Sequence, residues 1–359
     1  MNNYKVLGMM SGTSLDGLDM ALCHLWKDGD KWDFEIKTAK TITYPEWLYG
    51  FLADAVNLSS QAHDTLHETF GTWSGEEAKQ FIIEKNLEVD FIASHGHTSH
   101  HRPNLGLTFQ LGEGQHLANA SGHKVICDFR TKDVKLGGEG APLVPIGDEL
   151  LLSEYDFCLN LGGISNMSFK KNDERKAFDI GLANMPLNYI TKKINLPYDE
   201  DGKLAKKGNL DNGLLSALNA LAYYKLPYPK STGYEWFKLE VAPLIEKSSA
   251  PINDLLHTFI EHNCFQIKEA IKKEKTTKNS KMLVTGGGAL NSYYVSVLKR
   301  HLEGLVEVVI PPKKFIEYKE ALVFSLMGTL RELNEINVLK SVTGAKEDSC
   351  SGEIFLPKN

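Results

Sequence analysis

Three glycine-rich turns have the composition of anion-binding loops. They occupy residues 11–17, 162–163 and 286–288, and each follows a short apolar run that is typical of a β-strand. Glycine lets backbone N–H groups approach a ligand closely, and successive free N–H groups form a concave site for an anion. A plain tight hairpin explains any one turn equally well, but three in one chain favour a phosphate-handling site. None matches G-x-x-x-x-G-K-[ST] or G-x-G-x-x-G, so neither a P-loop nor a dinucleotide-binding motif is indicated.

Carboxylates accompany these turns. Asp16 and Asp19 belong to the first turn, and Asp179 follows the strand-like run 176–178. Ligands of open α/β sheets bind beyond the carboxyl ends of the strands. A carboxylate there could act as a general base or hold Mg²⁺ through its oxygens. A turn-forming or capping Asp is the structural alternative for each of the three.

A histidine-rich run and two polar positions offer further chemistry. Residues 94–102 contain four of the 12 histidines, but no H-E-x-x-H pair, so an ordinary polar surface or substrate hydrogen bonding is favoured over a zinc site. Arg130 and Asp133 form a second polar cluster that could hold an anionic or polyhydroxyl substrate, with an ordinary surface ion pair as the alternative. Glu320 opens the last strongly periodic helix, where a carboxylate complements the helix dipole.

The elements that position these residues follow the same order in both halves of the chain. Strands are predicted at 5–10, 18–25 and 32–43, and again at 155–161, 167–170 and 176–180, with a glycine turn after the first strand of each set. Further strands are predicted at 89–93, 125–128 and 282–285, and helices at 59–86, 252–275, from 291 onward and at 319–333. The pattern predicts an α/β protein with an internal duplication. The glycine- and proline-rich connector 137–145 marks the expected domain boundary.

Composition limits the class of protein. The chain has 359 residues and a formal net charge of −6, which argues against nucleic-acid binding because no basic excess exists to neutralise phosphates. At roughly 150 residues per domain, two domains are expected. No apolar run approaches the roughly 18 residues of a membrane helix. Five scattered cysteines without a CxxC pair indicate reduced thiols in a soluble, cytoplasmic protein.

The motifs together closely resemble those of the anhydro-N-acetylmuramic acid kinases, which share a superfamily with sugar kinases, heat-shock chaperone ATPases and actin. The most specific piece is the run 8–19, GMMSGTSLDGLD. Further matching blocks lie at 94–96, 128–133, 140–145, 160–166, 178–179, 229–233, 285–291, 320–322 and 341–345. The resemblance implies two duplicated ribonuclease-H-like, actin-like ATPase lobes that flank a nucleotide and substrate cleft. Residues 1–145, completed by 338–359, would form one lobe, and residues 146–337 the other.

The resemblance also implies a reaction and its participants. ATP and Mg²⁺ would be the cofactors, an anhydro-amino-sugar the substrate, and a homodimer the assembly. Asp179 would activate water to open the 1,6-anhydro bond while the released 6-oxygen takes the γ-phosphoryl group, giving N-acetylmuramic acid 6-phosphate for cell-wall recycling. Asp16 and Asp19 would hold Mg²⁺, and His95, Arg130, Asp133 and Glu320 would contact the sugar. The nucleotide would lie against Gly12, Thr13, Ser14, Leu15, Asp16, Gly17, Leu18, Asp19, Gly162, Gly163, Gly286, Gly287, Gly288 and Asn291.

The chain departs from the family pattern beside the expected base. The family usually has Thr and then Gly-Pro-Gly-Asn after the catalytic Asp, whereas residues 180–184 here are IGLAN. His97 and Glu139 stand where the family generally has Gln. The departures at Ile180, Leu182, Ala183 and His97 leave open a kinase of the same fold for another sugar. A weakly catalytic, nucleotide-dependent switch protein is a third hypothesis, and a metal hydrolase built on the histidine run is the last.

Overall fold

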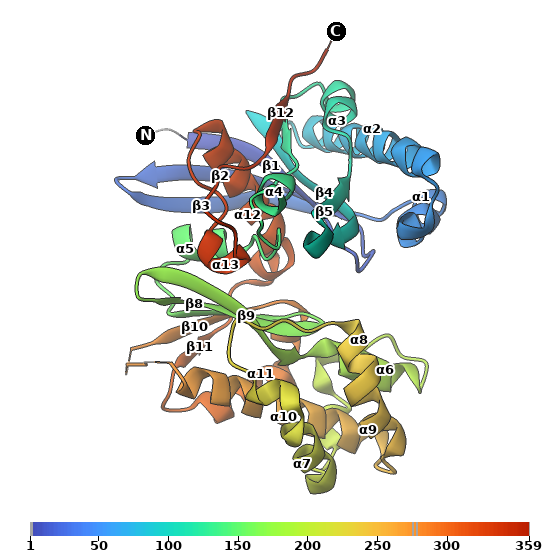
Figure 1. Cartoon of the computed structure of the whole chain (residues 1–359), viewed down its shortest axis with the longest axis vertical. Coiled ribbons are helices and arrows are strands. Elements are labelled where there is room, and N and C mark those ends of the chain that lie inside the picture. Colours follow the sequence, from blue (N-terminus) through green and yellow to red (C-terminus); the bar gives the residue numbers. More distant parts are fainter. Residues whose placement is uncertain (1–2, 275, 278, 359) are drawn as a thin grey trace. The chain divides into compact units, whose positions relative to one another are not determined.

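The chain forms two compact units, each built around its own β-sheet (Figure 1). The structure is a computed structural model that describes residues 3–274, 276–277 and 279–358. Unit 1 comprises Met1–Leu152 and Tyr318–Asn359, and unit 2 comprises Ser153–Glu317. The sequence placed the boundaries between the lobes at 145/146 and 337/338, whereas the structure places them at 152/153 and 317/318. The contacts of helices α5 (Pro145–Leu150) and α12 (Lys313–Glu332) explain this shift. An added Cβ on Gly147 of α5 would lie 2.5 Å from Val323 of α12, and Lys319 Nζ donates to Asp148 Oδ1 at 2.8 Å. Helix α5 and the part of α12 from Tyr318 onward therefore pack within unit 1.

Unit 1 contains a seven-stranded sheet in the order β12-β6-β4-β1-β2-β3, with β5 paired to β4. Its strands are β1 (Asn3–Ser11), β2 (Leu18–Asp28), β3 (Lys31–Ile42), β4 (Phe91–Arg102), β5 (Leu107–Leu111), β6 (Val125–Cys127) and β12 (Glu353–Phe355). Its other helices are α1 (Glu46–Ala53), α2 (Ser60–Glu84), α3 (Gly114–Ser121), α4 (Thr131–Lys135) and α13 (Lys340–Thr343). β1 reads as a continuous apolar run because it is central, and Val6, Leu7 and Met9 are fully buried.

Unit 2 contains a five-stranded sheet in the order β11-β10-β7-β8-β9. Its strands are β7 (Phe157–Leu161), β8 (Ile164–Lys171), β9 (Glu174–Leu182), β10 (Lys281–Thr285) and β11 (Glu307–Val309). Its helices are α6 (Asn184–Lys192), α7 (Asn212–Ala220), α8 (Tyr234–Trp236), α9 (Ala242–Lys247), α10 (Ile252–Lys272) and α11 (Ser292–Leu302). Helix α10 was expected to reach residue 275, which lies outside the described residues. Leu256, Ile260 and Ile267 recur at helical spacing on its buried face, which packs into the core of this unit.

Strand pairing confirms the duplication. β1, β2 and β3 form an antiparallel meander, β4 is parallel to β1, and β6 is parallel to β4. β7, β8 and β9 form the same meander, β10 is parallel to β7, and β11 is parallel to β10. The two-lobed α/β architecture predicted from the glycine turns is therefore correct.

The histidine run does not follow a short strand, as the sequence suggested, but forms the second half of β4. β5 pairs with this half of β4 in antiparallel orientation. The polar composition of the histidine run did not indicate this strand pairing. The pairing with β1 skips from Ser94 to His97, and Gly96 has φ +76°, so His95 and Gly96 form a bulge.

All five cysteines are free, and four of them are buried. Among the described helices, none combines the length and apolar composition needed to cross a membrane.

Candidate functional site

The first glycine turn is the hairpin that joins β1 to β2. Thr13, Ser14 and Asp16 are exposed on it, so their side chains are available to a ligand. Leu15 N–H donates to Gly12 O at 3.1 Å and closes the turn. Gly17 has φ +144°, and an added Cβ would lie 2.6 Å from Ile42 O, so only glycine fits there.

A buried chain of hydrogen bonds supports this hairpin from beneath. Tyr44 O–H donates to Gly17 O at 2.7 Å, so the Tyr44 oxygen must accept from Ser11 Oγ, 2.6 Å away. Ser11 Oγ in turn accepts from His97 Nδ1 at 2.8 Å. This order of donors assigns the proton of His97 to Nδ1. Burial lowers the pKa of His97 to about 4 and raises the pKa of Tyr44 to about 12, so both are neutral near pH 7.

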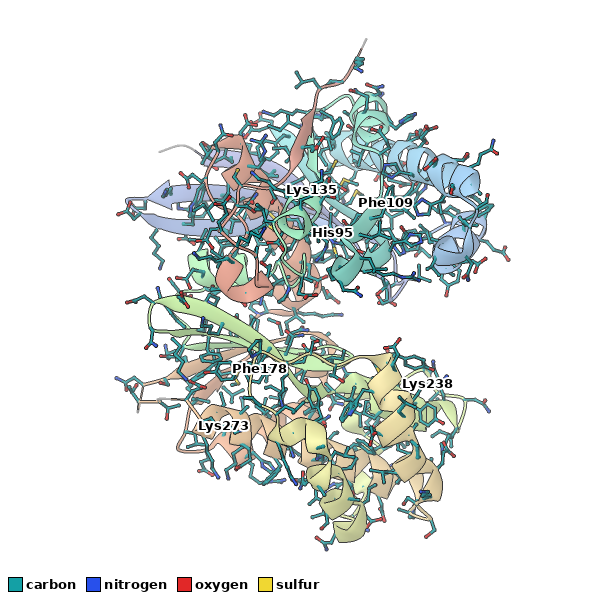
Figure 2. The ribbon with its side chains drawn as sticks, viewed as in Figure 1. His95, Phe109, Lys135, Phe178, Lys238 and Lys273 are labelled. Carbon is teal, nitrogen blue, oxygen red and sulfur yellow. The ribbon has the colours of Figure 1, made fainter. Side chains whose placement is uncertain are left out.

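A second group in unit 1 is centred on Arg130. Its Nε–H donates to His95 Nε2 at 2.9 Å and its Nη1–H donates to Gly140 O at 2.5 Å. His95 must then be protonated on Nδ1, which donates to Gly96 O at 2.9 Å (His95 is labelled in Figure 2). Burial and the Arg130 charge hold the pKa of His95 well below its usual range, while burial lowers the pKa of Arg130 to about 10. His95 is therefore neutral. Its Nδ1–H fixes the ring against Gly96 O, and its Nε2 accepts from the charged Arg130.

Glu320 follows the point where α12 bends, since Tyr318 has φ −115° and ψ 15°. Its side chain is exposed by surface area, yet many protein atoms surround the carboxyl group. This desolvation raises the pKa of Glu320, and the charges of Arg130 and Lys319 oppose the rise. The acid and the guanidinium thus influence each other without a direct ion pair among the described residues.

Asp133 has a different role from the one expected. It is 0% exposed, and its oxygens accept from Gly140 N–H at 2.8 Å and from Thr343 Oγ1 at 2.7 Å. It therefore holds the turn at residues 138–140 and presents no surface to a sugar. The expected sugar contact at Asp133 is corrected to a structural role.

In unit 2, one segment holds Asp179 on three sides. Asp179 N–H donates to Lys230 O at 3.0 Å, and Tyr223 O–H donates to Asp179 O at 2.8 Å. Thr232 N–H donates to Asp179 Oδ2 at 2.9 Å, while Oδ1 has no partner among the described residues. Desolvation raises the pKa of Asp179, and the Thr232 bond and the charge of Lys230 oppose the rise. The hydroxyl of Thr232 is also buried and without a partner in the described part of the chain.

The other two glycine turns meet in unit 2. Gly286 has φ +80°, and an added Cβ would lie 2.6 Å from Asn160 Oδ1 and 2.7 Å from the carbonyl carbon of Leu161. This glycine therefore lets the loop after β10 lie against the end of β7, which leads into Gly162 and Gly163. The Gly162 carbonyl accepts from Asn184 N–H at 3.0 Å, so the start of α6 fixes the second hairpin.

Asn291, expected near the nucleotide, is the N-cap of α11. Its Oδ1 accepts from Tyr294 N–H at 2.9 Å. One side-chain oxygen is thus committed to the helix.

Comparison with known proteins identifies the family. The sequence model of the family described as anhydro-N-acetylmuramic acid kinase matches residues 4–357. The chain belongs to the anhydro-N-acetylmuramic acid kinase family. The anhydro-N-acetylmuramic acid kinase of Haemophilus influenzae is 35% identical over 98% of each chain. That of Gloeobacter violaceus is 33% identical over 96% of this chain and 97% of its own length.

A solved structure is similar at a lower level. A ROK family glucokinase from Streptomyces griseus, in complex with glucose and AMPPNP, aligns over 89% of this chain and 97% of its own. The identity is 10% and the TM-score 0.40, and so weak a likeness carries no argument about function.

The three departures from the kinase family pattern that follow Asp179 lie in the core of unit 2. Ile180 is 2% exposed, Leu182 3% and Ala183 0%. Ile180 is the extra residue of a β-bulge, because Asp179 pairs with Asn166 and Gly181 with Ser165. These side chains pack inside unit 2, so their burial gives no support to a changed sugar specificity.

The histidine run does not form a metal site. Within residues 3–274, 276–277 and 279–358, no three His, Cys, Asp or Glu side chains come together in a way that could hold a metal ion. This part of the chain therefore gives no support to the metal-hydrolase hypothesis. Asp16 is exposed and Asp19 Oδ1 accepts from Thr41 Oγ1 at 2.6 Å, an oxygen donor set that suits Mg²⁺, which takes few protein ligands beside phosphate oxygens and water.

Sequence reasoning missed the residues that support the expected site residues. Tyr44 and Ser11 beneath the first hairpin, and Tyr223, Lys230 and Thr232 around Asp179, act through contacts between distant parts of the chain. The one available signal was the run PYPKSTG at residues 227–233, where two prolines precede a hydroxyl pair.

Proposed function

We propose that this protein is an ATP-dependent kinase that opens the 1,6-anhydro bond of anhydro-N-acetylmuramic acid and phosphorylates O6, in peptidoglycan recycling. Membership of the family along almost the whole chain supports this substrate and reaction. The observation that carries the mechanism is Asp179, a partly desolvated carboxylate with one oxygen anchored and the other without a partner among the described residues.

Asp179 acts as the general base. Its Oδ1 takes a proton from water, the water oxygen bonds to the anomeric carbon, and the bond from that carbon to O6 breaks. The electron pair left on O6 forms the new bond to the γ-phosphorus of ATP as the bond to the β-phosphate oxygen breaks, releasing ADP. Desolvation raises the basicity of Asp179 above that of an exposed carboxylate. The buried hydroxyl of Thr232, which has no partner among the described residues, would hydrogen-bond the water.

The glycine turns bind the nucleotide. Exposed Thr13 and Ser14 and the free N–H groups of the first hairpin contact phosphate oxygens, and the turns at 162–163 and 286–288 contact the remainder of ATP. Asp16 and Asp19 would hold Mg²⁺, which supplies neutralising charge to the transferring phosphoryl group. The protein works in the cytoplasm as a homodimer.

Arg130 and Glu320 contact the sugar. Arg130 is held rigid by His95 and Gly140, and its charge suits a carboxylate-bearing sugar. His95, with both nitrogens occupied, acts by positioning Arg130 rather than by touching the substrate.

The proposed reaction predicts a product with a defined mass. Incubation with ATP, Mg²⁺ and anhydro-N-acetylmuramic acid should yield a sugar heavier than the substrate by one phosphoryl group and one water, as seen by mass spectrometry. Reaction in ¹⁸O-labelled water should place the label in the hydroxyl group on the anomeric carbon. A product that gains the phosphoryl group alone would refute coupled hydrolysis, and turnover of ordinary hexoses without turnover of the anhydro sugar would refute the substrate.

The hydrogen-bond chain beneath the first hairpin predicts a binding defect in the Tyr44→Phe variant. Loss of the bond to Gly17 O should lower the free energy of unfolding by about 1 kcal/mol and raise the KM for ATP, because the hairpin is less well fixed. Steady-state kinetics with each substrate varied in turn measure this.

His97 offers a matched pair of controls. Asn can place an amide N–H near the position of His97 Nδ1, whereas Gln reaches toward Nε2, so His97→Asn should preserve the KM for ATP better than His97→Gln does. An unchanged KM for ATP in Tyr44→Phe would show that this series of hydrogen bonds has no part in nucleotide binding.

A further inference from the structure

A pocket of about 500 Å³ lies beside β9 in unit 2. Its walls come from β9, from the C-terminal half of α10, and from the segment 224–230. Among the described residues, neither Asp179 nor any of the glycine turns lines it. The volume is within the range of small-molecule sites, so the pocket could hold a ligand separate from the nucleotide and the sugar.

The wall of the pocket is aromatic and apolar. Phe178 and Tyr228 stack with ring centroids 5.1 Å apart, and Ile180 lies beside them. Tyr224 presents its ring, because its hydroxyl donates to His262 Nε2 at 2.9 Å. The direction of that bond follows from Asn219 Oδ1, which accepts from His262 Nδ1 at 2.7 Å.

The rim of the pocket carries positive charge. Lys230 Nζ donates to Tyr223 O at 3.1 Å and lies 4.3 Å from the centroid of the Tyr223 ring. Burial and the charge of Lys273 lower the pKa of Lys230 to about 8, and the charge of Asp179 opposes this shift. Figure 2 labels Phe178 in β9 and Lys273 beyond the end of α10.

The pocket lining offers this rim no unpaired acidic side chain among the described residues. Glu269, the acidic side chain in the lining, is paired with Lys272 at 2.8 Å. Lys273 has no acidic partner among the described residues. The two ammonium groups of Lys230 and Lys273 therefore repel each other, and an anion placed between them would relieve the repulsion.

We propose that this pocket binds a small organic anion, with its aromatic or aliphatic body against Phe178, Ile180 and Tyr224 and its carboxylate between Lys230 and Lys273. The apolar wall accounts for the body and the unneutralised rim for the charge. Lys230 lines the pocket, and its carbonyl accepts from Asp179 N–H. A bound ligand therefore touches the same segment that holds the Asp179 carboxylate through Thr232 N–H. The proposal concerns binding alone and does not depend on the reaction assigned above.

The test is a titration of the full-length protein with phenylacetate, followed by NMR of isoleucine δ1-methyl groups. The Ile180 methyl signal should shift saturably. The uncharged analogue phenylacetamide should produce no saturable shift. Lys273→Gln should weaken phenylacetate binding about tenfold, as expected for the loss of one hydrogen bond to a charged group.

Two further variants make the outcome decisive. Lys268→Gln removes a charge from helix α10, at a residue that does not line the pocket, and should leave the affinity unchanged. Ala270→Phe fills the pocket and should abolish binding, with circular dichroism showing that the variant is folded. The proposal is overturned if Ile180 shows no saturable shift, if phenylacetamide binds as tightly as phenylacetate, or if Lys268→Gln weakens binding as much as Lys273→Gln does.

Discussion

The Asp179→Asn variant should retain less than about one hundredth of the wild-type kcat, because a neutral amide cannot take a proton from the attacking water. The amide oxygen can still accept the Thr232 N–H bond, so the fold and nucleotide binding should be preserved. Single-turnover kinetics with ATP and anhydro-N-acetylmuramic acid measure the loss. Full turnover by this variant would show that Asp179 is not the base.

A control for this variant lies in the same hairpin. Asp173 is exposed at the turn between β8 and β9, with φ +61°, a conformation that Asn accepts readily. Asp173→Asn removes the same charge from the same hairpin and should leave kcat unchanged. An equal loss in both variants would point to a general electrostatic effect.

The same assignment predicts the acid side of the pH profile. Since the base must be ionised, kcat/KM should fall as the pH drops through the pKa of Asp179. Desolvation places that midpoint above the usual value for an aspartate. A general base works most efficiently when its pKa lies near the operating pH. The midpoint is measured from the pH dependence of kcat/KM of the wild type.

The Gly286→Ala variant should lose about 1–3 kcal/mol of its free energy of unfolding and most of its affinity for ATP. The new Cβ would meet backbone atoms of Leu161 at 2.7–2.8 Å, and φ +80° is unfavourable for alanine, so the loop after β10 must move away from β7. Chemical denaturation measures the first effect, and calorimetric titration with a non-hydrolysable ATP analogue measures the second.

The adjacent residue provides a matched control. An added Cβ on Gly287 would have as its nearest neighbour Asn184 Nδ2 at 3.7 Å, an ordinary contact. Gly287→Ala should therefore keep nearly the wild-type free energy of unfolding, so it is a control for the stability effect. Equal behaviour of the two variants would show that the close approach at Gly286 is not what forms the loop.

The fold could be predicted largely because its signals are local. An apolar run that ends on glycine and hydroxyl residues specifies a strand and its turn, and the repetition of this pattern at residues 11–17 and 162–163 revealed the two halves. β4 was underestimated because its second half is polar on both faces. Pairing with β5, rather than composition, makes that stretch a strand.

The candidate site residues could be singled out from the chemistry of their side chains, but the residues that hydrogen-bond them could not. Asp179 was expected at the end of a strand, which suggested a base, but it lies within β9. Its partner Thr232 lies 53 residues away along the chain. Asp133 was misjudged because its sequence neighbours are polar, although the turn at 138–140 and Thr343 bury it completely. Contacts of this kind depend on tertiary packing and leave no periodic signal in the sequence.

The common strand order of the two sheets points to a single ancestral domain that was duplicated and fused. Counted from the tip of the hairpin that follows the first strand of each copy, the pair Asn166–Asp179 in unit 2 corresponds to the pair Asp19–Thr41 in unit 1. One copy carries its carboxylate on the third strand, and the other carries it on the second. Under the mechanism proposed above, divergence at this one cross-strand pair would make two equivalent scaffolds chemically unequal, one suited to activating water and the other to managing phosphate charge.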